Sequence, residues 1–439
     1  MATESGSAAA EETFGWRHLL QKNVLVILLL GFSSGLPFPL VYSTLSSWLA
    51  DAGVQLSTVS TFAWLGFAYS FKFLWAPLVD TIRLPILTGW LGRRRAWMLF
   101  AQLMIVLSLF VLSGMDPREN IEAFALVAAA VALSSATQDI VIDAYRIECA
   151  ETRMQGVLAA AYQYGYRTAM LISGAVAMAI ADTAPWSVAY MTMAGCALVG
   201  VATTLWCKEP VVTLERVVVT GSNALEKVAR WFSHAVIDPF ADFVKRFGPF
   251  AFVLLAFISL YRLSDYVLGI LANPFYLDIG YTLTQIAVIA KGYGLWVGLV
   301  GIGLGGWGVI RFGVARCLVI ATILIASTNL FFAAMVIVGP EPWMLAVTIS
   351  ADNIAQGFSG TVLIAYLSSL TNLSFTATQY ALLSSFMSLL GKFSAGYSGN
   401  VQESIGWLGF FLYAAALGIP AIILAFVVAR RHDQLLADA

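Results

Sequence analysis

The chain has 439 residues and a formal net charge of −1, and 60% of its residues are hydrophobic while only 11% are charged. Soluble domains carry about 25% charged residues and about 45–50% apolar ones, so this composition excludes an ordinary soluble enzyme, a disordered chain and a basic nucleic-acid binder. The four cysteines show neither CxxC nor zinc-site spacing, and we therefore expect no metal site and no cofactor. The composition is that of a polytopic membrane protein.

Apolar runs long enough to cross a bilayer recur along the whole chain. A membrane-spanning helix needs about 20 apolar residues, and runs of this length are separated here by charged residues or by Pro, Gly and Asn. They predict an all-α membrane protein with 12 transmembrane helices. The predicted spans cover residues 23–47, 56–79, 96–114, 121–143, 155–181, 187–207, 248–273, 282–305, 312–338, 342–369, 376–399 and 405–430.

The positions of the basic residues predict the orientation of these spans. If the N-terminus lies in the cytoplasm, 18 of the 24 Lys and Arg residues fall in cytoplasmic segments, and only Arg118 falls in an outside loop. The other five lie within spans. Because cytoplasmic loops carry an excess of Lys and Arg, this distribution predicts that both termini are cytoplasmic.

The chain reads as two related halves. The sequence Asp51-x-Gly53 before the second span returns as Asp278-x-Gly280 before the eighth, which predicts two pseudo-symmetric six-helix bundles. Between them, an amphipathic stretch over 225–247 predicts a helix that lies on the membrane surface, with a solvated loop as the alternative. The expected domains are an N-terminal cytoplasmic tail (1–22), a first bundle (23–207), a cytoplasmic linker (208–247), a second bundle (248–430) and a C-terminal cytoplasmic tail (431–439).

Polar side chains within the spans are candidates for a transport site. A charged group facing lipid costs about 2.5–3.5 kcal/mol on insertion scales, so these groups should face the bundle interior, a partner or water. Cations outnumber the deeper acids, which favours an anionic cargo bearing carboxylate or phosphate groups, although pairing between helices is the structural alternative. The predicted substrate-binding residues are Lys72, Gln163, Tyr166, Arg167, Arg262, Lys291, Gln356 and Lys392.

Acidic residues suggest two further roles. Asp139 and Asp143 share one face of a predicted helix, where mutual repulsion favours proton uptake. We expect Asp139, Asp352 and Asp265 to be the candidates for proton coupling. Charged residues at the predicted cytoplasmic ends of the spans favour a gate that clamps the loops in one transport state. Its predicted members are Asp80, Arg93, Arg94, Arg95, Asp143, Arg146 and Glu148.

Two loops resemble the loop motif of the major facilitator superfamily, roughly G-x-L-x-D-R-x-G-R-R. The first copy is split between 76–80 (APLVD) and 92–95 (GRRR), and the second, 306–313 (GWGVIRFG), has Ile310 in place of the second acid. Further segments resemble the AmpG muropeptide permease family, and the fourth of them is the most specific. They are 31–37 (GFSSGLP), 72–80 (KFLWAPLVD), 92–97 (GRRRAW), 135–144 (SATQDIVIDA), 165–167 (GYR) with 173–174 (SG), and 262–265 (RLSD).

This resemblance implies a proton-driven importer in the bacterial inner membrane. The family's cargo is 1,6-anhydro-N-acetylmuramyl sugar-peptides from the cell wall, and their import serves peptidoglycan recycling and β-lactamase induction. Related carriers with similar motifs move acetyl-coenzyme A, which is also bulky and anionic. We expect a monomer whose partners are this small-molecule cargo and the lipid bilayer. A membrane-embedded enzyme or a channel is the alternative of another class, but His18, His234 and His432 all fall in predicted cytoplasmic segments.

Overall fold

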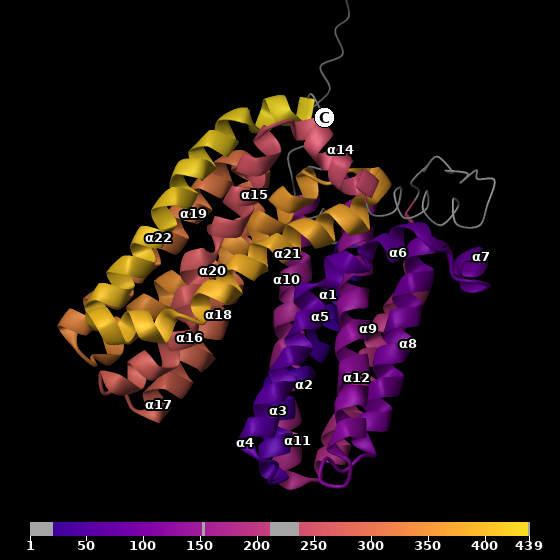
Figure 1. Cartoon of the computed structure of the whole chain (residues 1–439), viewed down its shortest axis with the longest axis horizontal. Helices are drawn as coiled ribbons and strands as arrows, with labels where there is room; N and C mark the ends of the chain where they lie inside the picture. The colour runs from indigo at the N-terminus through magenta and orange to yellow at the C-terminus, as the bar shows by residue number, and fades with distance from the viewer. Residues whose placement is uncertain (1–20, 152–153, 211–236, 438–439) are drawn as a thin grey trace, which may run out of the picture.

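The computed structural model describes residues 21–151, 154–210 and 237–437, and within these ranges it contains helices and turns but no strand. The helices form two bundles that stand side by side, α1–α12 and α15–α22 (Figure 1). In Figure 1 the bundles meet at the end that carries α6, α14 and the start of α21, which we call the closed end. They diverge toward the end that carries α4 and α17, which we call the open end. The predicted all-helical fold is confirmed.

The first bundle contains several helices that are broken within one predicted span. Its helices are α1 (Lys22–Gly35), α2 (Pro37–Val41), α3 (Ser43–Asp51), α4 (Leu56–Thr61), α5 (Phe67–Ser70), α6 (Ala76–Thr81), α7 (Leu87–Leu91), α8 (Arg93–Ser113), α9 (Ile121–Glu148), α10 (Gln155–Leu171), α11 (Ala177–Thr183) and α12 (Trp186–Trp206). Short 3-10 segments, Phe62–Gly66 and Lys72–Leu74, lie between α4 and α6. The chain breaks before α2 because Pro37 and Pro39 cannot both continue a regular helix.

The second bundle follows the short helix α14 (Asp238–Phe247). Its helices are α15 (Phe250–Tyr261), α16 (Leu263–Asp278), α17 (Leu283–Gln285), α18 (Gly294–Phe312), α19 (Val314–Val338), α20 (Pro342–Ser369), α21 (Thr376–Ala395) and α22 (Ser398–Ala437), with a π-helical segment, Ile286–Tyr293, before α18. All predicted spans therefore fall on helices or on consecutive helical segments. In the described ranges, eight helices are long and apolar enough to cross a membrane, or up to nine if one bent pair counts as a span. The number of 12 crossings stays a prediction.

The internal repeat has a structural counterpart at the open end. Asp51 accepts a hydrogen bond of 2.8 Å from the indole N–H of Trp186, and Asp278 accepts one from the indole N–H of Trp407. Gly53 has φ +76° and its counterpart Gly280 has φ +105°, a conformation that glycine adopts without strain. The two bundles therefore close their corresponding turns with the same contact.

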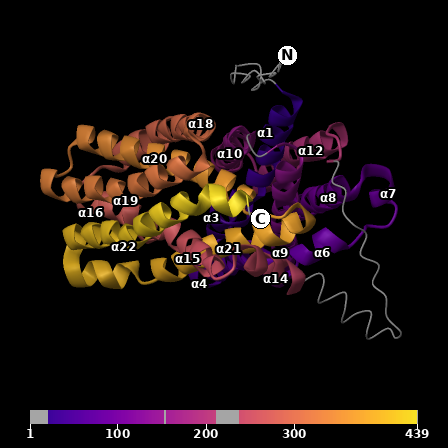
Figure 2. The same cartoon turned by 90° about the horizontal axis from the view of Figure 1, so that it is seen from above.

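Small residues bring the two bundles together along one seam. Helix α10 packs on α18 and α20. A Cβ on Gly156 would lie 2.6 Å from Val309, and one on Gly306 would lie 2.9 Å from Ala160. On the other side of the molecule, α21 packs on α6 and α9, and Figure 2 shows the bundles adjoining along α10, α18 and α20. This arrangement leaves two helix interfaces between the bundles, one on each side of the centre.

Helix α14 lies on the second bundle. Phe243 and Phe247 are buried in the same core cluster as residues of α15, α19 and α20. The apolar contacts of these two side chains are thus with the protein, and the prediction that the linker helix lies on the membrane surface stays a prediction. The rest of the predicted linker, 211–236, and most of the predicted N-terminal tail lie outside the described residues.

We predict that Gly31→Val strongly lowers the amount of folded protein. A Cβ at Gly31 would lie 2.2 Å from the carbonyl oxygen of Tyr162, so α1 and α10 would have to separate. Overpacking of this kind costs about 1–3 kcal/mol or more. Gly195→Val is the matched control, because nothing lies within 4 Å of a Cβ there. Thermal unfolding of the two purified variants and of the wild-type protein measures their stability. An unfolding midpoint of Gly31→Val equal to that of Gly195→Val would contradict the close contact between α1 and α10.

Candidate functional site

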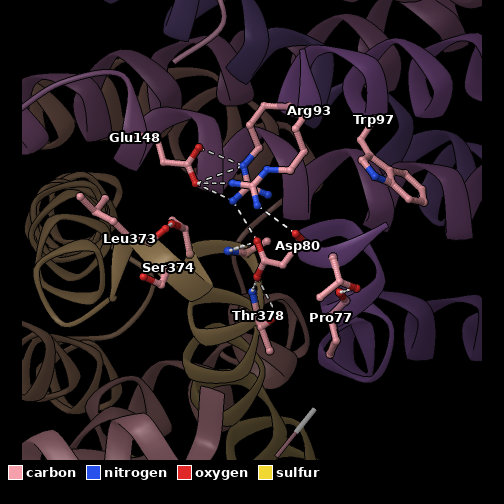
Figure 3. Close-up of polar contacts among 12 residues, drawn as sticks. Pro77, Asp80, Arg93, Trp97, Glu148, Leu373, Ser374 and Thr378 are labelled. Carbon is pink, nitrogen blue, oxygen red and sulfur yellow. Dashed lines mark hydrogen bonds and ion pairs between the residues drawn. The ribbon is translucent and has the colours of Figure 1, made fainter. Parts of the chain in front are cut away.

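A buried cluster of charges lies at the closed end (Figure 3). The Nη2 of Arg94, at the start of α8, donates to Oδ1 of Asp80 in α6 at 2.8 Å. The Nε of Arg94 donates to both carboxylate oxygens of Glu148 at the end of α9, at 3.1 and 3.0 Å. The Arg94 side chain is 1% exposed. Arg93 joins the cluster by donating to the backbone oxygen of Asp80 at 2.9 Å and lying 3.7 Å from Glu148.

Asp80 also reaches the other bundle. Its Oδ2 accepts hydrogen bonds from the backbone N–H and the hydroxyl of Thr378, at 2.8 and 2.7 Å, and its Oδ1 accepts from the N–H of Ala377 at 3.3 Å. These N–H groups belong to the first turn of α21, which has no partners for them within the helix. A carboxylate is favoured there by the helix dipole as well. We call these contacts, with Arg94 and Glu148, the Asp80 latch.

A second polar contact joins the bundles close to the latch. The Nη1 of Arg146 donates to the hydroxyl of Ser368 in α20 at 2.8 Å, and its guanidinium lies 5.3 Å from the ring centre of Tyr380 in α21. Asp143 lies between two cations, 3.7 Å from Arg146 and 3.6 Å from Nζ of Lys72. Lys72, predicted as a substrate ligand, is therefore buried and paired with an acid of another helix.

One predicted gate residue points elsewhere. Arg95 donates to the backbone oxygens of Thr204 and Leu205 at the end of α12, at 2.9 and 3.0 Å. The guanidinium of Arg95 therefore lies at the end of α12 and not in the cluster that Arg93 and Arg94 share. The structure thus corrects the placement of Arg95. Sequence analysis missed Glu209, whose carboxylate accepts from the N–H groups of Arg94 and Arg95 at 2.8 and 3.0 Å.

Arg167 lines a small pocket between the bundles. This pocket joins α10 of the first bundle to α18 and α20 of the second, and Asn353 and Gln356 supply its amide side chains. Across the described residues, the guanidinium of Arg167 forms no hydrogen bond or ion pair, and its side chain is exposed. Arg262 is close enough for its like charge to act on Arg167, and is itself paired with Asp265 at 2.9 Å, as its spacing predicts.

Two of the three acids expected to couple protons, Asp139 and Asp352, lie in different bundles. Asp139 in α9 is buried and accepts a hydrogen bond from the Ser34 hydroxyl, which also contacts the Tyr162 hydroxyl at 2.7 Å. Asp352 in α20 is buried as well and accepts a hydrogen bond of 3.0 Å from Gln356. Asp139 and Asp352 are therefore both buried carboxylates that accept a hydrogen bond from a neighbouring polar side chain.

The remaining predicted ligands are spread around the centre. Gln163 in α10 donates to the Thr361 hydroxyl in α20 at 2.9 Å, so it joins the bundles. Lys392 in α21 donates to the Ser70 hydroxyl in α5 at 2.6 Å. The Tyr166 ring lies 6.0 Å from that of Tyr162. Lys291 is exposed on the segment before α18, and the described structure gives it no polar contact there, so it is not brought to Arg167.

Comparison with known proteins adds relatives that cover nearly the whole chain. Residues 23–194 match the family model described as acetyl-coenzyme A transporter 1. Putative transporter AmpG 4 of Rickettsia felis is 34% identical over 407 residues, covering 92% of this chain and 96% of the relative. The anhydromuropeptide permease of Escherichia coli is 32% identical over 410 residues, covering 93% and 80%.

The chain belongs to the AmpG permease family. Its fold is that of the major facilitator superfamily. The proton:xylose symporter XylE superposes with a TM-score of 0.65 at 13% identity, covering 93% of this chain and 94% of that one. The human organic anion transporter MFSD10 superposes with a TM-score of 0.59 at 15% identity, covering 93% and 99%. This AmpG-family protein is a multi-pass membrane transporter and not an enzyme.

We predict that Arg94→Gln destabilises this AmpG-family protein markedly. The substitution leaves Asp80 and Glu148 buried with no full counter-charge, which costs about 3–5 kcal/mol. Arg118→Gln is the matched control, since Arg118 is 68% exposed and pairs only with Asp116 at the surface. Thermal unfolding in detergent should give a much lower midpoint for the first variant and an almost unchanged midpoint for the second. Similar midpoints for both would show that the latch contributes little.

Proposed function

We propose that this transporter uses a proton gradient to import anhydro-muropeptides, the N-acetylglucosamine-1,6-anhydro-N-acetylmuramyl peptides, across the bacterial inner membrane. The import supplies peptidoglycan recycling and β-lactamase induction. The Escherichia coli relative is named for this cargo and aligns with 93% of the chain. The observation in the molecule that carries the proposal is the guanidinium of Arg167, which forms no hydrogen bond or ion pair among the described residues and lines a pocket between the bundles.

Twelve transmembrane helices with both termini in the cytoplasm complete this proposal. The concentration of Lys and Arg in one set of loops supports it, because such loops stay on the cytoplasmic side. Arg93, Arg94 and Arg146 belong to this set and lie at the closed end. The closed end is then cytoplasmic, and the structure corresponds to a conformation that opens outward.

The cargo is held through its anionic groups in this proposal. A guanidinium binds a carboxylate with two parallel hydrogen bonds, so Arg167 is suited to a peptide carboxylate of the muropeptide. The amide groups of Asn353 and Gln356 line the same pocket and suit the N-acetyl and peptide amides. Arg262, a further predicted ligand, is paired with Asp265 in this conformation and would have to exchange this partner to bind the cargo.

Asp139 and Asp352 carry the proton in this proposal, with Asp265 as a further candidate. Their burial supports this role, since a buried carboxylate is more easily neutralised by a proton than an exposed one. The transport cycle then rocks the bundles about the α10–α18 seam. The Asp80 latch and the contact between Arg146 and Ser368 must break before the cargo can leave on the cytoplasmic side.

A second candidate cargo is acetyl-coenzyme A or another bulky organic anion. The match of residues 23–194 to the acetyl-coenzyme A transporter model favours this alternative. The phosphates of coenzyme A suit Arg167 as well as a carboxylate does, so the two cargoes must be separated by measurement.

We predict gradient-driven uptake of a labelled disaccharide tripeptide, N-acetylglucosaminyl-1,6-anhydro-N-acetylmuramyl-tripeptide, by vesicles that contain the purified protein. Uptake should rise when an inward proton gradient is imposed and fall when a protonophore removes it. Labelled acetyl-coenzyme A is tested in parallel, and saturable uptake of this compound alone would reject the muropeptide.

In the same vesicles, we predict that the Asp139→Asn and Asp352→Asn proteins no longer respond to the proton gradient. They should still exchange labelled cargo outside the vesicles for unlabelled cargo inside, because this exchange needs no net proton movement. A full response in both variants would exclude these acids.

We predict that Arg167→Ala lowers uptake by about tenfold to a hundredfold, the effect of losing a hydrogen-bonded charge partner. Arg167→Lys should retain part of the uptake, because it keeps the charge and loses the paired hydrogen bonds. Arg118→Ala, at an exposed site, is the control. The amount of folded protein is measured by size-exclusion chromatography. An Arg167→Ala protein that folds normally and transports at the wild-type rate would disprove the role of Arg167.

A further inference from the structure

A second network of hydrogen bonds holds the start of α21 from the side opposite the latch. Arg246 of α14 donates to Oδ2 of Asp242 at 2.9 Å, to the backbone oxygen of Leu370 at 3.1 Å and to Oε1 of Gln379 at 2.9 Å. Asn372 donates to both oxygens of Asp242 at 3.2 Å. We call Asp242, Arg246, Asn372 and Gln379 the linker clamp.

Gln379 is the centre of the linker clamp. It is 1% exposed, and its Nε2 donates to Oδ2 of Asp242 at 2.8 Å and to the backbone oxygen of Pro239 at 2.9 Å. Its Oε1 also accepts from the backbone N–H of Asn372 at 2.8 Å. A buried amide with all these partners has one orientation, because any rotation would leave a buried polar group without a partner.

The linker clamp and the Asp80 latch hold neighbouring residues of one helix turn. Gln379 directly follows Thr378, whose N–H and hydroxyl bind Asp80. The linker clamp also binds Leu370, which lies with its own member Asn372 in the turn where the chain bends by 102° between α20 and α21. The apolar side of α14 is anchored separately, through Phe243 and Phe247 in the core of the second bundle.

We propose that the linker clamp is a positioning device for the latch: α14 fixes the first turn of α21 so that its free N–H groups face Asp80. A helix end that is not fixed frays, and its N–H groups then point in many directions. By holding the turn in one geometry, α14 removes the ordering cost that Asp80 would otherwise have to overcome. This inference rests on the proposed function, in which the latch closes the cytoplasmic side.

The consequence is that α14 biases the equilibrium between the two transport conformations. Arg246 and Gln379 touch neither the cargo site nor Asp80, so they act on the latch only through the shape of the α20–α21 turn. Loss of the linker clamp should therefore open the cytoplasmic side more often, without changing the central site at Arg167.

Alkylation of a single cysteine measures this opening without cargo or proton gradient. The four native cysteines are replaced by serine, and Ala381 is changed to Cys. Ala381 is 1% exposed because it lies on the side of α21 that packs against the first bundle. It becomes accessible to N-ethylmaleimide only when the closed end opens. Because no transport is measured, a failure of the proposed cargo leaves this test intact.

We predict that Arg246→Ala raises the alkylation rate about tenfold, the shift expected when one charged hydrogen-bonding group is lost from a two-state equilibrium. Asp80→Asn should raise it as well. The decisive variant combines both changes. If the linker clamp acts through the latch, the double variant is alkylated within about twofold of Asp80→Asn alone, because residues that act as a unit are not additive. Arg311→Ala, at an exposed cation on the end of α18, is the matched control and should leave the rate unchanged.

Two results would overturn the inference. One is a normal alkylation rate in a folded Arg246→Ala protein, with folding checked by thermal unfolding. The other is a double variant in which the two effects multiply, which would mean that α14 acts independently of Asp80. Asp242→Asn is a milder second variant, in case Arg246→Ala does not fold. It should shift the rate in the same direction, and an unchanged rate in this folded variant would count equally against the linker clamp.

Discussion

The closed end depends on one interaction, in which the buried carboxylate of Asp80 accepts hydrogen bonds from the first turn of α21. Asp80 comes from a short helix of the first bundle, and its partners include backbone N–H groups of the second. Arg94 and Glu148 complete the charge balance at this point, within the first bundle. The acid therefore serves two purposes at once, because it neutralises a buried guanidinium and satisfies the end of a helix. An uncharged side chain could do neither fully.

The two interfaces between the bundles differ in their chemistry, because one is charged and the other is mainly apolar. The first copy of the loop motif supplies Asp80, whereas the second has Ile310 where the second acid would stand. On that side, Gly156, Ala160 and Gly306 allow a close apolar contact instead. When helices tilt against each other, a contact between small apolar residues has no ion pairs to break. The interface between α10 and α18 is therefore suited to stay packed while the bundles rotate about it. The charged interface has discrete partners and suits a latch.

Much of this arrangement could be predicted from the sequence, where the signal is local. The helical spans, the internal repeat and the pairing of Arg262 with Asp265 all follow from spacing within one segment. The pairing of Asp80 with the arginines at the start of α8 could be predicted, but its contact with the first turn of α21 could not. The partners of Lys72 and Gln379 could not be predicted either, because they come from distant parts of the chain and depend on how helices pack. The placement of Arg95 in the gate was wrong for the same reason, since its partners are backbone oxygens at the end of α12, which only the packing of α8 on α12 brings near. The position of α14 also depends on packing, which amphipathicity alone does not specify.

The matching indole contacts at the open end have a further consequence. Asp51 with Trp186 and Asp278 with Trp407 each tie together two helices of one bundle, and neither pair crosses to the other bundle. In the described residues, the hydrogen bonds between the bundles lie at the centre or the closed end. Each bundle thus has its own Asp–Trp hydrogen bond at the open end. This contact holds the helix ends of that bundle together when the two bundles separate. The outer ends of the two bundles can therefore move apart or together as rigid bodies. The polar contacts that oppose this movement lie mainly at the closed end.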